Sequence, residues 1–146
     1  MTRSLAESLL IALLATNAGL LAFIAGVLRK VMNDMDDSQF KQFVTSLVHH
    51  SKKSPFMIAI LNVPLFAAIP YFYKYRFENR WLFAALAIWL IAGTIGKIMK
   101  LPVYKAIEMR DGIKLREQRA KLNVANTLQA LLNSLAVVLA IFPLVS

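Results

Sequence analysis

The chain has 146 residues, of which 58% are hydrophobic and 17% are charged. This composition is too apolar for an ordinary soluble domain, and the length is too short for two membrane domains, so we expect a single integral membrane domain over residues 1–146. The net charge is +9, but the basic residues cluster between apolar stretches, which indicates membrane topology and anionic lipid rather than nucleic acid. Cysteine is absent, which excludes disulfides, thiolate catalysis and cysteine-ligated metals.

The first apolar stretch, residues 9–28, carries no charge. About 20 apolar residues are enough to cross the hydrocarbon core of a membrane as a helix. We expect a membrane span rather than a signal peptide, because the apolar run is too long and Glu7 precedes it. Asn17 is its only strongly polar residue, and we expect it to serve helix packing.

An amphipathic helix is predicted over residues 37–51, with Asp36 or Asp37 at its N-cap. Its apolar residues recur at helical spacing, at Phe40, Phe43, Val44, Leu47 and Val48. Such a helix lies along the membrane surface or folds back over the mouth of the bundle. It ends in His49 and His50, which point about 100° apart on a helix and so do not suit a shared metal ion. They are either solvated interfacial residues or include a proton carrier at a site.

The second span is predicted over residues 55–73, with a proline at its first position. Pro64 and Pro70 lie inside it, and each removes a backbone hydrogen bond. The carbonyl groups released in this way need a new donor, either from Asn62 or from a neighbouring helix. The resulting kink serves packing or opens a cavity.

The third span is predicted over residues 81–99. It follows the second after a short turn, so the two are expected to be antiparallel neighbours. An aromatic belt surrounds this turn, formed by Tyr71, Phe72, Tyr73, Tyr75 and Trp81. Near the end of the span, Lys97 either extends to the headgroups or meets Arg119 around an anionic ligand.

A basic connection, residues 100–121, contains Pro102, Tyr104 and a predicted turn at Asp111 and Gly112. The fourth span follows over residues 122–145. One side of this last helix is polar, because an arc of roughly 140° holds Arg116, Arg119, Asn123, Asn126, Gln129 and Asn133. Polar groups are costly in lipid, so the stripe should face other helices or a water-filled cavity. The amides either form a site or simply lock helix to helix.

Topology follows from the positions of the basic residues. Thirteen of the 17 Lys and Arg residues lie between residues 29 and 53 or between residues 97 and 121. We therefore expect both of these connections in the cytoplasm and both termini outside, in a bacterial inner membrane. All eight acidic residues lie outside the predicted spans, which disfavours a proton-coupled pump.

Four short motifs, taken with their order along the chain, carry a resemblance to a known family. They are Asn17-Ala18-Gly19-Leu20, Ser54-Pro55-Phe56-Met57, Leu101-Pro102-Val103-Tyr104-Lys105 and Arg119-Ala120-Lys121-Leu122-Asn123-Val124-Ala125-Asn126. With the four-span layout, they resemble the anthrone oxygenase-like family of small four-span membrane proteins, most of which have no assigned function. The chain departs from that pattern at Leu122, where the family has an aromatic residue. The resemblance implies a four-helix transmembrane bundle and, for the fungal members, oxidation of an aromatic substrate.

Two hypotheses of function follow. In the first, the bundle binds a membrane lipid or another amphiphilic or aromatic ligand, or packs against a partner protein or a second copy of itself. In the second, which the resemblance implies, it oxidises an aromatic or quinone-like substrate without a cofactor or metal. His49 or His50 would then act as the base, and Asn123, Asn126 and Arg119 would stabilise the oxyanion. The residues expected to contact a ligand are Asn62, Lys97, Arg119, Asn123, Asn126 and Asn133.

Overall fold

The computed structural model describes residues 2–109 and 114–145, with side chains described as far as Pro143. Its elements, in chain order, are α1 (Arg3–Phe23), the π-helical segment η1 (Ile24–Leu28), α2 (Arg29–Asp34), α3 (Asp37–Lys53), α4 (Pro55–Tyr75), α5 (Arg80–Met109) and α6 (Lys114–Val145). No strand occurs within these described ranges. The predicted turn at Asp111 and Gly112 lies outside them.

Among the described residues, four helical stretches are long and apolar enough to cross a membrane: Arg3–Asp34, Pro55–Tyr75, Arg80–Met109 and Lys114–Pro143. The first of these joins α1, η1 and α2 into one continuous helix. The prediction of an all-α chain with four helices of membrane-spanning length is therefore confirmed. The predicted spans 9–28, 55–73 and 81–99 lie inside the first three of these stretches, and the span 122–145 lies inside α6.

The basic connection predicted over residues 100–121 is mostly helical, which corrects that prediction. Helix α5 continues through Pro102 to Met109, and α6 already begins at Lys114. The extra turns are stabilised by burial, because Val103 and Ile107 pack against apolar side chains of α3 and α6 in one cluster. A proline inside a helix is tolerated where such packing offsets the lost hydrogen bond.

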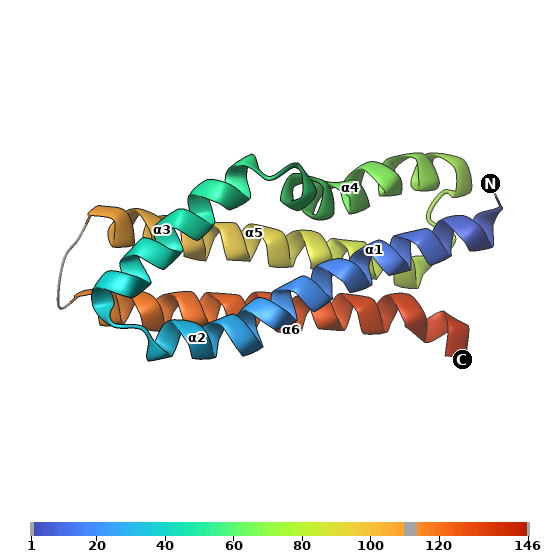
Figure 1. The fold of residues 1–146 in the computed structure, drawn as a ribbon. Helices are drawn as coiled ribbons and strands as arrows, with labels where there is room; N and C mark the ends of the chain where they lie inside the picture. Colours follow the sequence, from blue (N-terminus) through green and yellow to red (C-terminus); the bar gives the residue numbers. More distant parts are fainter. Residues whose placement is uncertain (1, 110–113, 146) are drawn as a thin grey trace.

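The helices form a bundle in which α5 and α6 pack along their lengths, and α1 packs against α6 and α4 (Figure 1). Both chain termini and the turn between α4 and α5 lie at one end, which we call the terminal end. The opposite end holds α2, the start of α3, the end of α5 and the start of α6 (Figure 1). We call this opposite end the basic end. Helix α3 runs obliquely from the basic end across α5 to the point where α4 begins.

Two apolar clusters hold the bundle together. The cluster towards the terminal end joins α1, α4, α5 and α6 and includes Leu10, Leu14, Tyr71, Leu82, Leu86 and Trp89. The cluster at the basic end joins α2, α3, α5 and α6 and includes Met32, Phe40, Val44, Ile107 and Leu122. Outside both clusters many large apolar side chains are exposed, among them Phe56, Phe66 and Ile69 of α4. An apolar outer surface of this kind is what a lipid environment requires.

Helix α3 begins as predicted. The Asp36 carboxylate accepts a hydrogen bond from the backbone N–H of Gln39 at 2.8 Å, and the Gln39 side chain accepts one from the backbone N–H of Asp36. This capping box satisfies two N–H groups that a helix start leaves free. Phe40 and Val44 then face the bundle and are buried. The remaining surface of the helix is mostly polar and exposed.

Pro64 explains the buried Asn17 of α1. Because proline has no N–H, the carbonyl group of Ile60 loses its donor within α4. The side chain of Asn17 in α1 donates a hydrogen bond to this carbonyl oxygen at 3.2 Å. The predicted need for a donor is thus met by a neighbouring helix. Asn62 instead donates to the carbonyl of Ile58, at 2.7 Å, within its own helix.

Candidate functional site

The polar stripe of α6 faces the interior of the bundle. Asn126 and Asn133 are 3% and 2% exposed, and Gln118 is also buried. The stripe was predicted to face other helices or a water-filled cavity, and burial against other helices is confirmed for Asn126 and Asn133, whereas Arg116 is exposed. The Asn133 side chain donates to the carbonyl of Gln129 one turn earlier, at 2.8 Å, while its own oxygen is buried without a hydrogen-bond partner among the described residues.

Gln129 is reached by a lysine from α5. The ammonium group of Lys100 donates to the Gln129 side-chain oxygen at 2.5 Å. Gly96 makes room for this contact, since a Cβ atom placed on it would lie 2.6 Å from Cδ of Gln129. Lys100, and not the predicted Lys97, is therefore the lysine that meets the amide stripe. Lys97 is exposed, as expected if it extends towards the headgroups.

At the basic end, Arg119 joins α6 to the corner between α2 and α3. Its guanidinium donates to the backbone carbonyls of Asn33 and Met35, at 3.2 and 2.9 Å, where α2 ends. It also contacts the carboxylate of Asp37 at 3.3 Å and stacks over the ring of Phe40, 4.3 Å from its centroid. These carbonyls have no partner within the helix, so the arginine caps the C-terminus of α2.

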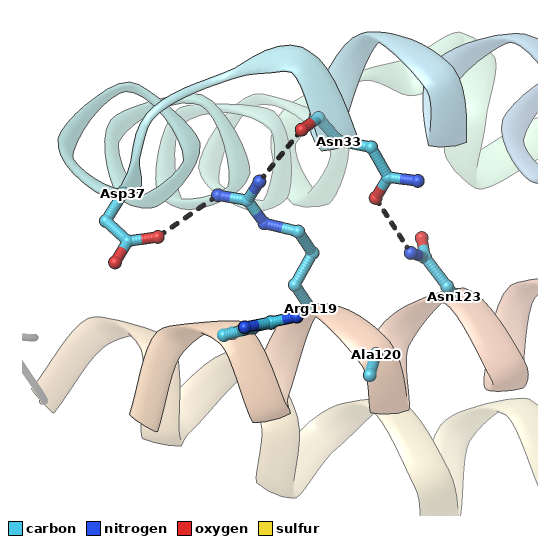
Figure 2. A pocket seen from close by; sticks show the side chains of 6 residues that line it. Asn33, Asp37, Arg119, Ala120 and Asn123 are labelled. Carbon is cyan, nitrogen blue, oxygen red and sulfur yellow. Dashed lines mark hydrogen bonds and ion pairs between the residues drawn. The ribbon is translucent and has the colours of Figure 1, made fainter. Parts of the chain in front are cut away.

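An open cavity of about 390 Å³ lies beside this arginine, lined by Asn33, Asp37, Arg116, Arg119, Ala120 and Asn123. Figure 2 shows Arg119 reaching from α6 towards Asn33 and Asp37, with Asn123 on the same side of α6. The Asn123 side chain donates to the side-chain oxygen of Asn33 at 3.0 Å. Two helical segments that are far apart in the sequence therefore supply the polar walls of one cavity.

Two polar atoms at this cavity are buried without a partner among the described residues: Nε of Arg119, which is a donor, and Oδ1 of Asn123, which is an acceptor. An unpaired buried polar atom costs about 1–3 kcal/mol, so such atoms point to a missing partner. Arg116 adds an exposed positive charge at the rim. The lining of the cavity therefore combines two arginine side chains, one carboxylate and two amides.

The other predicted site residues lie elsewhere. His49 and His50 are exposed on α3, with their rings 5.5 Å apart in an edge-to-face contact, and neither lines this cavity. Asn62 is exposed on α4. Asn126 and Asn133 are buried in the interior and do not line the cavity. Of the predicted ligand-contacting residues, the structure places Arg119 and Asn123 together.

Sequence reasoning missed Asn33 and Asp37 as partners of the α6 stripe. Their distance in sequence from α6 left no periodic signal that connects them. The available signal was the excess of basic residues between residues 29 and 53 and between residues 97 and 121, because these two segments meet at the end of the bundle where the cavity lies.

The fold indicates the class of this chain, a multi-pass membrane protein. The chain is all-helical in its described ranges and has four apolar helices of membrane-spanning length, as a multi-pass membrane protein has. Comparison with protein-family models, curated proteins and solved structures found no match to this chain. The resemblance to the anthrone oxygenase-like family therefore stays a prediction, as does oxidation with His49 or His50 as the base.

Proposed function

We propose that this protein is a small multi-pass membrane bundle that binds the phosphate-bearing headgroup of a membrane lipid in the cavity at its basic end. The observation that carries the proposal is the open cavity lined by Arg116, Arg119 and Asn123, where Nε of Arg119 and Oδ1 of Asn123 have no partner among the described residues and need a small side-chain movement to reach a ligand. A lipid phosphate supplies the acceptor that the arginine lacks. A hydroxyl or ammonium group beside the phosphate supplies the donor that the asparagine lacks.

The charge of the cavity supports the same assignment. Arg116 and Arg119 outnumber Asp37, and the Asp37 carboxylate already contacts the Arg119 guanidinium. The rim charge of Arg116 is therefore available to a phosphate. Basic residues near a membrane surface are each worth about 1 kcal/mol of attraction to anionic lipid. No chemical step is needed for this function.

The proposed orientation places the basic end in the cytoplasm and both termini outside, in the inner membrane of a bacterium. In this arrangement α3 lies at the level of the cytoplasmic headgroups. Phe40 and Val44 hold it against the bundle, and its polar residues face the water. The cavity between α2, α3 and α6 then opens where lipid headgroups are found.

Native mass spectrometry of gently extracted protein tests the binding. Wild-type protein is titrated with phosphatidylglycerol, which has both a phosphate and hydroxyl donors, and with phosphatidylcholine, whose headgroup has no donor. We expect phosphatidylglycerol to bind more tightly, and Asn123→Leu to weaken it about three- to ten-fold, because the variant removes one hydrogen bond of ordinary strength.

Two matched controls accompany this titration. Asn62→Leu makes the same chemical change at an exposed position of α4, and Lys105→Gln removes one exposed basic charge from α5 as Arg116→Gln does from the cavity rim. Only the cavity variants should weaken binding. Equal losses in control and cavity variants, or a second protein retained in place of lipid, would contradict the proposal. The subunit mass from the same spectra shows whether the bundle forms a homo-oligomer.

The orientation has its own test, which uses the absence of cysteine from the sequence. Ser4→Cys and Ser38→Cys each introduce one exposed thiol, at the terminal and basic ends respectively. A membrane-impermeant maleimide applied to intact spheroplasts should label the thiol at position 4 and leave the thiol at position 38 unlabelled. The reverse pattern would invert the topology.

A further inference from the structure

A second cavity, of about 450 Å³, lies at the terminal end of the bundle. Its lining comes from the start of α1, the turn before α5, the start of α5 and the end of α6. Both charged and apolar side chains line it, among them Arg3, Glu7, Glu78, Arg80 and Trp81. This cavity shares no lining residue with the one at the basic end.

The Glu7 side chain, which lines this cavity, is held in place by hydrogen bonds from three other side chains. Its Oε1 atom accepts hydrogen bonds from three side chains, namely Nε of Arg3 at 3.0 Å, the hydroxyl of Tyr71 at 2.5 Å and Nδ2 of Asn79 at 3.1 Å. Asn79 also caps α5, since its Oδ1 accepts from the backbone N–H of Leu82 at 3.0 Å. The carboxylate is therefore held rigidly between α1, α4 and α5.

All three of these bonds end on one oxygen of the carboxylate. None of them uses the other oxygen, Oε2, and the Glu7 side chain is 16% exposed where it lines the cavity. A positioned carboxylate oxygen that remains open is an acceptor for an ammonium group. Arg80 supplies the opposite charge, because it is exposed on the wall of the same cavity.

Exposed aromatic side chains at the terminal end favour a position for this cavity at the level of the lipid headgroups. Three large aromatic side chains are exposed at this end, with Tyr73 at 89%, Phe77 at 60% and Trp81 at 43%. Exposed Trp and Tyr residues gather at the interface between lipid and water. Ile11, Ala140 and Pro143 contribute apolar side chains to the lining, and these suit contact with the beginning of an acyl chain.

We propose that this terminal-end cavity binds a zwitterion in which an ammonium group and a phosphate are joined, as in the headgroup of an aminophospholipid. The ammonium group donates to Oε2 of Glu7, the phosphate pairs with Arg80, and Trp81 covers the attached carbon chain. The inference is independent of the lipid site at the basic end. If both sites exist, the bundle holds one lipid in each leaflet.

The test uses the two tryptophans of the chain, Trp81 and Trp89. Protein labelled with 5-fluorotryptophan gives two ¹⁹F resonances, which Trp81→Phe assigns. In nanodiscs, replacing phosphatidylcholine with phosphatidylethanolamine should shift the resonance of Trp81, which lines the cavity, and leave that of buried Trp89 in place. Phosphatidylcholine is the matched lipid because its methylated ammonium group donates no hydrogen bond.

Charge-neutralising variants complete the test. Glu7→Gln keeps an oxygen for Arg3, Tyr71 and Asn79 but loses the charge, and Arg80→Gln changes an exposed residue, so the fold is retained in at least one of them. Each should raise the amount of phosphatidylethanolamine needed for half of the shift about ten-fold, because a charge-assisted hydrogen bond is lost. The matched controls Glu108→Gln and Arg76→Gln lie outside the cavity and should change nothing.

The possible outcomes distinguish a bound lipid, a bound free zwitterion and the absence of a site. Equal ¹⁹F spectra in both lipids, or equal effects of cavity and control variants, would overturn the proposal. If soluble phosphoethanolamine produces the shift in phosphatidylcholine nanodiscs, the site is supported and its occupant is a free zwitterion instead of a lipid. Asn123→Leu, at the other end, should leave the Trp81 response unchanged, so failure of the basic-end site is seen separately.

Discussion

The hydrogen bond between Asn17 and the carbonyl of Ile60 should contribute to the free energy of unfolding only because Pro64 is present. Asn17→Ala removes the donor and leaves a small void at a residue that is 2% exposed. In lipid such a bond contributes about 0.6 kcal/mol on average and up to about 1.7 kcal/mol. Here the carbonyl has no other donor in its own helix, so we expect a value near the upper limit, together with about 1 kcal/mol for the void.

Pro64→Ala should make most of this hydrogen-bond contribution disappear. An alanine at position 64 has an N–H that reaches the Ile60 carbonyl, as in any α-helix. A double-mutant cycle therefore isolates the bond, because the costs of the void and of lost proline packing cancel. We predict a coupling energy of about 1 kcal/mol between Asn17→Ala and Pro64→Ala.

The assay is unfolding by sodium dodecyl sulfate in mixed micelles, followed through tryptophan fluorescence in a Trp81→Phe background, which leaves buried Trp89 as the reporter. Thr16→Ala serves as the neighbouring control, since the Thr16 hydroxyl bonds only to Ala12 in its own helix. Its effect should add to that of Pro64→Ala. If Asn17→Ala and Pro64→Ala are also additive within about 0.3 kcal/mol, the explanation of Asn17 as the substitute donor is refuted.

Three further predictions use the same unfolding assay. Arg119→Met should destabilise the bundle by about 2–3 kcal/mol, because the carbonyls of Asn33 and Met35 lose their donor, while Arg116→Met at the exposed rim should change little. Equal effects of these two variants would contradict the capping role of Arg119. Gly96→Ala should cost about 1–2 kcal/mol by displacing Gln129 from Lys100, whereas Gly93→Ala, whose Cβ meets nothing within 4 Å, should be neutral or stabilising. A neutral Gly96→Ala would mean that Gln129 moves aside without cost. Tyr71→Phe should cost about 1.5 kcal/mol through its lost bond to Glu7, and Tyr73→Phe, at a residue that is 89% exposed, should have no effect. A loss in both tyrosine variants would show that the phenol ring, and not the bond to Glu7, is responsible.

The sequence was sufficient to predict the helices, because four long apolar runs and one amphipathic repeat leave few alternatives. It also predicted the cap at Asp36 and the burial of the amide stripe of α6. The predicted end of α5 and the predicted start of α6 were wrong, because Pro102 and the polar composition of residues 100–121 suggested a non-helical connection. Tertiary packing of Val103, Ile107 and Leu115 overrides these local signals.

The candidate site was only half predictable. Arg119 and Asn123 share a face of α6, which periodicity reveals. Their partners Asn33 and Asp37 come from a corner more than eighty residues earlier in the chain, and no local pattern reports such a contact. The same holds for Lys100, which meets Gln129 because Gly96 lets the two helices approach. Geometry between distant helices was the missing information.

The most direct measurement of the central claim is photo-crosslinking with a phosphatidylglycerol that carries a diazirine on its headgroup, followed by peptide mapping. Binding at the basic end predicts adducts concentrated on residues 29–40 and 114–124, which include the walls of the cavity, and a marked loss of these adducts in Asn123→Leu. Adducts spread evenly along the apolar surface of α4, or adducts at the basic end that persist unchanged in Asn123→Leu, would contradict the assignment of this cavity to a lipid headgroup.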